Sequence, residues 1–479
     1  MSKLVVGVLV AAALAAAPGR SLALHQVEGR VGAKTLYGIW VPDRWNGDLV
    51  LYAHGFRNPN CPLAVPTDPV VPTATCPDPQ SGTPPQVAAV RDTLLSFGYA
   101  FAASSYSETG FALKEGVKAT LQLGKIFSRR FGTPSRTYLY GHSMGGAIVL
   151  KLAEQHPKAF DGALVMCGMI GGSPAELQYV VDARATFDAF FPGVAPGNVK
   201  SVPPQLTFYG DVLPAVLPLF DPENPDFFLN FAKAAAWASS DQVAFPFASF
   251  PELVQGILEL LYNQTLATPG VVEAAGGFPA SNEQVAYSWS DPDALSVDVS
   301  SVDGSVKRVR ADPLALTWAE DWYDTTGAIS FPVMTVHTIR DAAVPMLHER
   351  LYAKKVAAAG RSHLLVQRTV SHAPKGDPSP PPDGHCTFKP AEELAALADL
   401  LGWVATGTRP AGGDATVDEP TPAPVPLPPG SGARPERCDF DEDELDADPR
   451  TDEREDRRGR DGGRHGREER CEEHAPRRR

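Results

Sequence analysis

Short apolar runs alternate with amphipathic stretches along most of the first 400 or so residues. The runs that predict strands are residues 49–53, 99–103, 137–140, 162–167, 331–337 and 364–367. The stretches that predict helices are residues 87–97, 113–131, 145–155 and 392–404. Strands that are apolar throughout are buried on both faces, and their alternation with helices requires right-handed crossovers. The pattern therefore predicts an α/β fold with a mostly parallel central sheet covered by helices on both faces.

One long segment, residues 172–328, does not follow this alternation. It is rich in aromatic residues and proline and predicts helices at residues 228–238 and 251–262, but no strand-helix unit. Open α/β sheets bind ligands at the carboxyl ends of their strands. We therefore expect a helical lid insertion that covers this edge of the sheet.

The first 23 residues have the three parts of a secretory signal peptide. Lys3 precedes an apolar run over residues 4–17, and the small-residue sequence Ser21-Leu22-Ala23 follows it. This run is shorter than the roughly 20 residues that span a bilayer. We expect cleavage after Ala23, a secreted protein in an extracellular or periplasmic compartment, and no stable insertion in a membrane.

The other end of the chain has a different composition. Residues 411–479 begin with a proline-rich stretch and continue into a charged tail with 13 Arg and 17 Asp plus Glu from residue 431 onward. With almost no apolar residues, such a tail buries too little surface to offset the entropy of ordering. The predicted catalytic domain is therefore residues 24–410, followed by a linker and a disordered tail.

The overall composition excludes one class of function. The chain has 479 residues, of which 43% are hydrophobic, and a net charge of −14. It has enough apolar residues for a large core, but it lacks the excess of Lys and Arg that binds phosphate backbones. We expect no nucleic-acid partner.

The chain has six cysteines, which an oxidising compartment allows to pair. Cys61 and Cys76 bracket a proline-rich segment with little means of holding its own shape, so we predict a disulfide between them. Cys167 ends an apolar run and is interpreted as a small buried hydrophobic residue. No pairing is predicted for the other cysteines.

A nucleophile motif follows the strand predicted at residues 137–140. The sequence Gly141-His-Ser-Met-Gly145 matches G-x-S-x-G, and a predicted helix begins at its end. A sharp strand-to-helix turn needs neighbours without a bulky Cβ, so that the serine hydroxyl projects bare into the site. This context makes Ser143 the candidate nucleophile.

The acid and the base should follow the serine in that order along the chain. Asp341 follows the strand predicted at residues 331–337, in a loop where a carboxylate would point inward. His385 precedes the last predicted helix and is favoured as the base, with His372 as the alternative. Three other histidines lie within strand or helix patterns and are interpreted as structural: His337, His348 and His363.

Acyl transfer also needs hydrogen-bond donors for the developing oxyanion. One candidate is the backbone N–H of Met144, which follows the nucleophile. The other is the backbone N–H of Phe56 in His54-Gly55-Phe56, directly after the strand predicted at residues 49–53. We also hypothesise that the predicted disulfide braces the loop that carries Phe56.

Four short sequences together resemble a known family. They are Gly-His-Ser-Met-Gly-Gly at 141–146, His-Gly-Phe at 54–56, Arg-Asp-Ala-Ala-Val-Pro at 340–345 and Gly-His-Cys-Thr-Phe at 384–388. Over about residues 27–407 the chain resembles the secreted serine hydrolases, carboxylesterase-like or lipase-like, of the α/β-hydrolase superfamily. The resemblance implies the α/β-hydrolase fold, a triad of Ser143, Asp341 and His385, and cleavage of carboxylic esters through an acyl-enzyme.

We do not assign the chain to a narrower family of esterases. The pair His385-Cys386 is similar to tannases and feruloyl esterases, but those enzymes also place a cysteine before the serine, and this chain has His142 there. The sequence thus predicts an esterase without fixing its acyl or alcohol group, and a polymeric ester is as acceptable as a small one. No oligomeric state is predicted.

Two other functions remain open. A prolyl-type peptidase or amidase uses the same fold and triad, and a non-catalytic binding module could use the same scaffold. The apolar and aromatic lid segment favours an acyl chain or aromatic ring, and hence an ester. No HExxH or CxxC spacing occurs, and no GxGxxG follows a strand, so no cofactor and no metal are expected.

Overall fold

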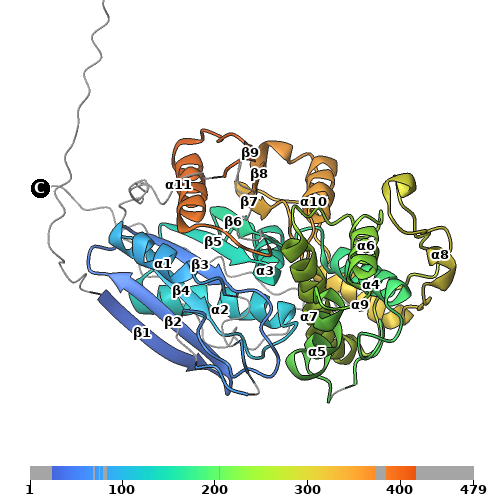
Figure 1. The fold of residues 1–479 in the computed structure, drawn as a ribbon. Coiled ribbons are helices and arrows are strands. Elements are labelled where there is room, and N and C mark those ends of the chain that lie inside the picture. Colours follow the sequence, from blue (N-terminus) through green and yellow to red (C-terminus); the bar gives the residue numbers. More distant parts are fainter. Residues whose placement is uncertain are drawn as a thin grey trace, which may run out of the picture. The chain divides into compact units, whose positions relative to one another are not determined.

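A computed structural model of the chain describes residues 24–67, 71–74, 76–78, 83–203, 205–372 and 384–416. The expected signal peptide, and the expected linker and tail from residue 417 onward, lie outside these residues. Within them, no helix is both long enough and apolar enough to cross a membrane. Figure 1 shows the arrangement of the elements.

The centre of the fold is a mixed sheet with strand order β1-β2-β4-β3-β5-β6-β7-β8-β9. Its strands are β1 (Leu24–Val31), β2 (Thr35–Pro42), β3 (Asp48–Ala53), β4 (Ala100–Ser104), β5 (Arg136–His142), β6 (Gly162–Met166), β7 (Val333–Thr338), β8 (Leu365–Val370) and β9 (Gly413–Asp414). The pairs β1-β2 and β2-β4 are antiparallel, and all other pairs are parallel. The predicted mostly parallel sheet is confirmed.

Helices cover both faces of the sheet, as predicted. Helices α2 (Leu113–Phe131), α3 (Met144–Gln155) and α10 (Leu347–Ala358) pack on one face, while α1 (Val87–Ser96) and α11 (Pro390–Thr406) pack on the other. Strand β3 divides its side chains accordingly: Leu49 and Leu51 join the first core, and Val50 and Tyr52 join the second. This alternation is the period of two that a buried strand imposes.

The antiparallel strands β1 and β2 were not predicted. Strand β1 lies at the edge of the sheet and is mostly exposed, with polar residues such as Gln26 and Arg30 among its members. Its register is set by backbone pairing with β2, from Leu24 opposite Pro42 to Val31 opposite Thr35. Strand β1, which is held mainly by backbone hydrogen bonds, lacks the apolar run that identifies a buried strand. Strand β2 is buried and contains the apolar run Ile39-Trp40-Val41, which the sequence analysis did not use.

Between β6 and β7 the described residues form helices and loops but no strand. We call residues 173–323 the insert. Its α-helices are α4 (Ser173–Phe190), α5 (Leu213–Val216), α6 (Phe227–Ala238), α7 (Phe250–Ala275), α8 (Val302–Ser305) and α9 (Pro313–Tyr323). In Figure 1 they lie together at one side of the sheet. The insert has its own core around residues such as Phe187, Trp237 and Leu261.

Helix α7 is twice as long as the stretch predicted for it. Ser249 caps its start by accepting a hydrogen bond from the backbone N–H of Glu252, and Gly276 ends it in a left-handed conformation. Pro269 lies inside the helix without ending it. Tertiary packing of the buried face of α7 therefore outweighs the local preference of proline to stop a helix.

A fully buried arginine ties the insert together. The Arg184 guanidinium on α4 donates to Asp188 Oδ1 at 2.8 Å, to Gln264 Oε1 of α7 at 2.6 Å and to the Ala195 carbonyl at 2.9 Å. A buried charge is tolerated only when it is paired and its donors are satisfied, as they are here. Arg184 thereby fixes α4 and α7 relative to each other.

Candidate active site

Ser143 lies in the turn between β5 and α3 with a backbone φ of 55° and ψ of −124°. A positive φ is unusual for a residue other than glycine and marks strain at a functional turn. A Cβ on Gly141 would lie 2.6 Å from the Gly145 carbonyl oxygen, and one on Gly145 would clash with the backbone of Ala53. The two glycines of the motif are therefore required by close backbone packing around the serine.

The structure brings Ser143, His385 and Asp341 together in one hydrogen-bonded chain. His385 Nε2 lies 2.7 Å from Ser143 Oγ, and His385 Nδ1 lies 2.7 Å from Asp341 Oδ2. Asp341 is in the loop after β7, and His385 lies between β8 and α11, so all three come from the carboxyl ends of strands. The alternative base, His372, is instead hydrogen-bonded to Glu392 at 3.0 Å.

The surroundings of these three hydrogen-bonded residues favour an ionised Asp341 carboxylate and a basic His385 imidazole. The backbone N–H groups of Ala343 and Val344 donate to Asp341 Oδ1 at 3.0 and 2.8 Å. Burial acts to raise the pKa of Asp341, but His385 and His337 together hold it well below its ordinary value. Burial acts to lower the pKa of His385, but the neighbouring Asp341 outweighs it and raises that pKa.

His337 has a more specific place than the structural role expected for it. Its Nε2 lies 2.7 Å from the Val344 carbonyl and 3.5 Å from Asp341 Oδ2, and its Nδ1 lies 3.2 Å from Glu349 Oε1. Although burial acts against the charge, the contacts with Asp341 and Glu349 raise the pKa of His337 to about 10. A protonated His337 therefore lies behind the acid and stabilises its charge.

The two candidate oxyanion donors lie beside Ser143. Met144 is the first residue of α3, where backbone N–H groups have no partner within the helix and the helix dipole favours negative charge. Phe56 lines both cavities that contain Ser143. Before it, His54 stacks on Tyr106 at a centroid distance of 3.8 Å, and burial together with Arg57 lowers the pKa of His54 to about 3. His54 is thus neutral and packs against Tyr106, directly before Gly55 and Phe56.

The loop after Phe56 is tied down by Arg57 and by a disulfide. Arg57 donates to the Ala64 carbonyl at 2.8 Å and to Thr83 Oγ1 at 3.2 Å. The predicted disulfide between Cys61 and Cys76 is present. These contacts connect the segment after Phe56 to more distant parts of the same loop, in agreement with a bracing role.

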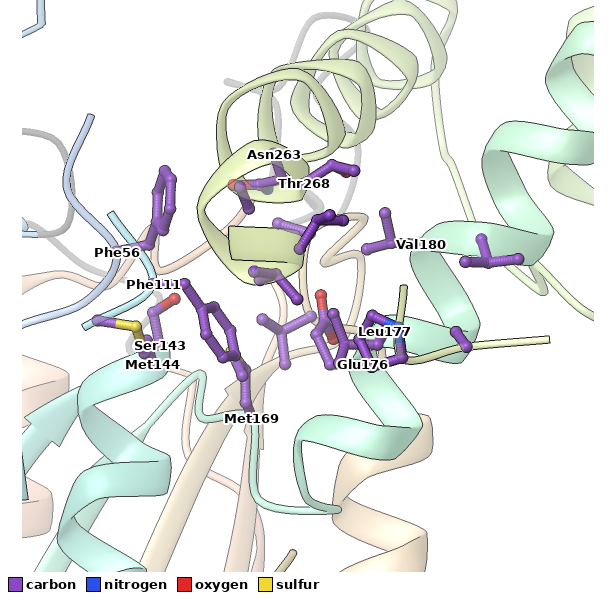
Figure 2. Close-up of a pocket in the computed structure, with 18 of the residues that line it drawn as sticks. Phe56, Phe111, Ser143, Met144, Met169, Glu176, Leu177, Val180, Asn263 and Thr268 are labelled. Atoms are coloured by element: carbon purple, nitrogen blue, oxygen red, sulfur yellow. The ribbon is translucent and has the colours of Figure 1, made fainter. Parts of the chain in front are cut away.

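Two cavities meet at Ser143 and His385. The first, which we call the aliphatic cavity, has a volume of about 740 Å³. Its apolar wall includes Phe111, Met169, Leu177, Val180, Val181, Val199, Val271, Val272 and Phe278. Figure 2 shows Ser143 and Met144 at one end and Leu177 and Val180 of α4 toward the other. Glu176 also lines it, and its carboxylate lies 2.8 Å from His348 Nε2.

The second cavity, which we call the aromatic groove, has a volume of about 1480 Å³. Its apolar wall consists of Phe56, Phe208, Leu217, Phe220, Phe250, Pro251, Val254, Leu258, Tyr262 and Ala343. Gln255, Glu259 and Asn263 add polar groups. Most of the walls of both cavities come from the insert, whereas Ser143, Asp341 and His385 come from loops of the sheet.

Comparison with protein families gives one match, which covers part of the chain. A family model described as serine aminopeptidase, S33, matches residues 120–205. This stretch contains β5, the turn with Ser143, α3 and β6. Over these residues the chain is similar to this family of serine aminopeptidases. The matched residues do not include Asp341 or His385.

Comparison with solved structures finds esterases and lipases at low similarity. An esterase from Aspergillus oryzae has 13% identity and a TM-score of 0.43 over 81% of each chain. Candida antarctica lipase A has 16% identity and a TM-score of 0.39 over 82% of this chain and 77% of that one. Feruloyl esterase B from Aspergillus oryzae has 12% identity and a TM-score of 0.40 over 80% of this chain and 81% of that one. At this level of similarity we draw no conclusion from these structures about the activity or the substrate of this chain. No curated protein matches its sequence.

The interpretation of Cys167 as an unpaired hydrophobic residue is wrong, because the structure has a disulfide between Cys167 and Cys386. Cys167 follows β6, beside the end of β5, and Cys386 directly follows His385. The two are separated by 219 residues in the sequence, so no local pattern connects them. Together with His385 they form a compact group of metal-ligand types, but sulfurs bonded to each other offer no thiolate. The disulfide instead links the histidine loop to the sheet.

A second network that sequence reasoning missed lies beneath the nucleophile turn. The carboxylate of Glu393 on α11 is fully buried and accepts hydrogen bonds from Tyr140 and, at 2.7 Å, from Gln86. His142 Nε2 lies 3.1 Å from the same carboxylate, and the Tyr52 hydroxyl lies 3.3 Å from His142 Nδ1. The residue before Ser143 is thereby connected to α11. A glutamate on the apolar face of the predicted last helix was the available signal.

Proposed function

We propose that this hydrolase cleaves carboxylic esters with Ser143 as nucleophile, His385 as base and Asp341 as the acid that orients it. The observation that carries the proposal is the continuous chain of two 2.7 Å contacts from Ser143 Oγ through His385 to Asp341. Ser143, at one end of this hydrogen-bonded series, has a strained backbone and lies where two largely apolar cavities meet. Nucleophile, base and orienting acid within hydrogen-bond reach are the requirements for acyl transfer.

In the first step, Ser143 Oγ attacks the ester carbonyl carbon while His385 Nε2 takes the hydroxyl proton. Asp341 holds the imidazolium that forms, and the backbone N–H groups of Phe56 and Met144 donate to the oxyanion. His385 then gives the proton to the leaving alcohol oxygen, which leaves an acyl-serine. In the second step, water attacks the acyl carbon with His385 again as base, and Ser143 is released.

The two cavities suggest how an ester is placed. The leaving alcohol receives its proton from His385, so it departs on the histidine side. Gln255 and Glu259 of the aromatic groove lie close to Gly384, the residue before His385, which assigns the alcohol to this groove. The aliphatic cavity extends from Met144 along the valines of the insert and is assigned to the acyl chain.

We also propose that the enzyme works outside the cytoplasm. Two disulfides are present among the described residues, and structural disulfides persist in oxidising compartments. The signal-peptide pattern of residues 1–23 points the same way.

A peptidase is the second candidate, because the matching family model is described for aminopeptidases. A free substrate amine would need a carboxylate near the acyl group, and Glu176 lines the aliphatic cavity. However, the Glu176 carboxylate is already hydrogen-bonded to His348 at 2.8 Å. With this partner in place, the rest of the cavity favours an uncharged acyl chain.

The test is hydrolysis of p-nitrophenyl esters from acetate to palmitate, together with aminoacyl p-nitroanilides, by the wild type and by Ser143→Ala. Ester turnover should fall about 10⁵-fold or more in the variant, because removal of the nucleophile disables the whole triad. The control Ser96→Ala changes an exposed serine on α1 and should keep wild-type rates. Wild-type turnover in Ser143→Ala would contradict the mechanism, and a preference for the anilides would identify a peptidase.

A further inference from the structure

Glu259 is the one carboxylate that lines the aromatic groove among the described residues. It lies on α7 and accepts a hydrogen bond from Gln255 Nε2 at 2.7 Å, and the backbone N–H of His385 also interacts with its carboxylate. An ionised carboxylate has room for about four donors. Glu259 therefore places acceptor capacity in the groove, directly beside the catalytic histidine.

No positive charge of Lys or Arg balances this carboxylate within the described lining of the groove. A second carboxylate strengthens the negative field from behind the aromatic wall: Asp78 accepts hydrogen bonds from the hydroxyls of Tyr262 and Tyr209. Asn58 Nδ2 holds Asp78 from the other side at 2.8 Å. In a site with apolar walls such charges act over a low dielectric, and they attract cations and repel anions.

The walls of the groove also suit a cation. The ring of Tyr262 lies 5.2 Å from that of Phe208 and 6.3 Å from that of Tyr209, and Phe220 lies 6.2 Å from Phe250. Aromatic faces attract organic ammonium groups, and they also accept the alkyl substituents that such groups carry. The groove therefore combines aromatic surface with a carboxylate, which are the two components that recognise an alkylated ammonium ion.

We propose that the aromatic groove binds an ester whose alcohol part carries an ammonium group, with Glu259 as the anionic partner and Tyr262 and Phe208 as the aromatic wall. This inference rests on the proposed ester hydrolysis and on the placement of the alcohol in the groove. Because Glu259 interacts with the backbone of His385, the ammonium group and the ester oxygen are separated by a short spacer. Glu259 is thus a specificity-determining residue.

The protonation of Glu259 gives the preference a characteristic pH dependence. Burial raises the pKa of Glu259 to about 7; the hydrogen bond from Gln255 opposes this rise, the charge of Asp341 adds to it, and His385 opposes it. Below this pH the carboxyl is neutral, so the attraction for a cation is weak. Above it the carboxylate is charged, and the preference for a cationic ester should increase.

The experiment compares butyrylthiocholine with S-(3,3-dimethylbutyl) thiobutyrate, in which a neutral carbon replaces the ammonium nitrogen. The measured quantity is the ratio of the two kcat/KM values, because the titration of His385 affects both substrates and cancels. We expect the ratio to favour the cation in the wild type and to fall about tenfold in Glu259→Gln, because the amide has no charge that attracts the trimethylammonium group. The ratio should rise from pH 6 to 8 in the wild type and stay flat in the variant.

Glu273→Gln is the matched control, since Glu273 is an exposed glutamate on the same helix, and it should keep the wild-type ratio. A wild-type ratio near one, or a ratio that Glu259→Gln does not change, would overturn the proposal. A loss in Glu259→Gln confined to alanine p-nitroanilide and alanine p-nitrophenyl ester would also overturn it, because there the ammonium group belongs to the acyl part.

Binding separates this proposal from the catalytic one. Calorimetry with Ser143→Ala should show tighter binding of butyrylthiocholine than of its neutral analogue, and Ser143→Ala/Glu259→Gln should lose this difference. Binding of this kind without turnover in the wild type would contradict ester hydrolysis and support the cation site. Equal binding of both compounds would overturn the cation site whatever the turnover.

Discussion

The sheet with its covering helices and the insert contribute differently to the site. The sheet places Ser143, Asp341 and His385 on loops at the carboxyl ends of its strands, with His337 behind the acid. The insert has its own core, fixed by the buried Arg184, and supplies most of the cavity walls. On the proposed mechanism, rate and selectivity are determined by separate parts of the chain, and changes to each part can test this division.

Among the changes that test this division, the largest effect is expected from Asp341→Asn, a change within the sheet region. The asparagine amide would donate to His385 Nδ1 and leave the proton on Nε2, so that the imidazole cannot accept the proton of Ser143. We expect kcat/KM to fall about 10⁴-fold. If the division is correct, the p-nitrophenyl ester series will show the same factor for every acyl length.

The control for this change is Asp291→Asn, an exposed aspartate of the insert, which should keep wild-type kinetics. A loss in Asp341→Asn that varied strongly with acyl length would mean that the acid also shapes selectivity. The division between sheet and insert would then fail.

The next largest effect is expected on the free energy of unfolding when a disulfide is removed. The Cys167–Cys386 disulfide closes a loop of 219 residues that contains the whole insert, whereas Cys61–Cys76 closes only 15. On the chain-entropy model, removing the long link lowers the free energy of unfolding by about 5 kcal/mol and removing the short one by about 3 kcal/mol. Urea unfolding of Cys167→Ala/Cys386→Ala and Cys61→Ala/Cys76→Ala checks this order.

Reduced wild type provides an internal standard for both disulfide variants. It should unfold at a lower urea concentration than either variant, because it lacks both links. A greater loss from removing the short link than from removing the long one would contradict the order that the chain-entropy model predicts.

The smallest effect is expected in the insert, from Val180→Trp in the aliphatic cavity. The indole would shorten the space assigned to the acyl chain, so kcat/KM for palmitate and other long esters should fall by about 10- to 100-fold. Acetate should be hydrolysed as before, and the chain-length optimum should move to shorter esters. The p-nitrophenyl series measures this directly.

Val254→Trp makes the same change of size in the aromatic groove and serves as the control. It should leave the acyl-length optimum in place. An equal shift from both variants would contradict the assignment of one cavity to the acyl chain and the other to the alcohol.

The comparison also explains which elements the sequence predicted well. The buried parallel strands from β3 to β6 contain continuous apolar runs, and the helix predicted at residues 113–131 has the bounds observed for α2. In the insert, α4 was not predicted, because its buried face includes Glu176, Asp182 and Arg184. Polar residues that are buried with partners look like surface residues when the partners are unknown.

The same limit applies to the site. The motif around Ser143 and the order of Asp341 and His385 along the chain predicted three residues that the structure brings together. The missed contributors all depend on contacts between distant segments. Cys167 pairs across 219 residues, and Glu393 reaches Tyr140 and His142 from the last helix. In the sequence, the one indication of the Cys167–Cys386 disulfide was that Cys386 directly follows His385.

Helix α7 forms a wall of both cavities. Residues of its first half, from Pro251 to Tyr262, face the aromatic groove, those from Ala267 to Val272 face the aliphatic cavity, and Asn263 lines both. A displacement of this one rigid element alters the two cavities together. Adaptation to a new acyl group and adaptation to a new alcohol will therefore be epistatic: the fitness effect of a substitution in one half of α7 depends on the residues present in the other.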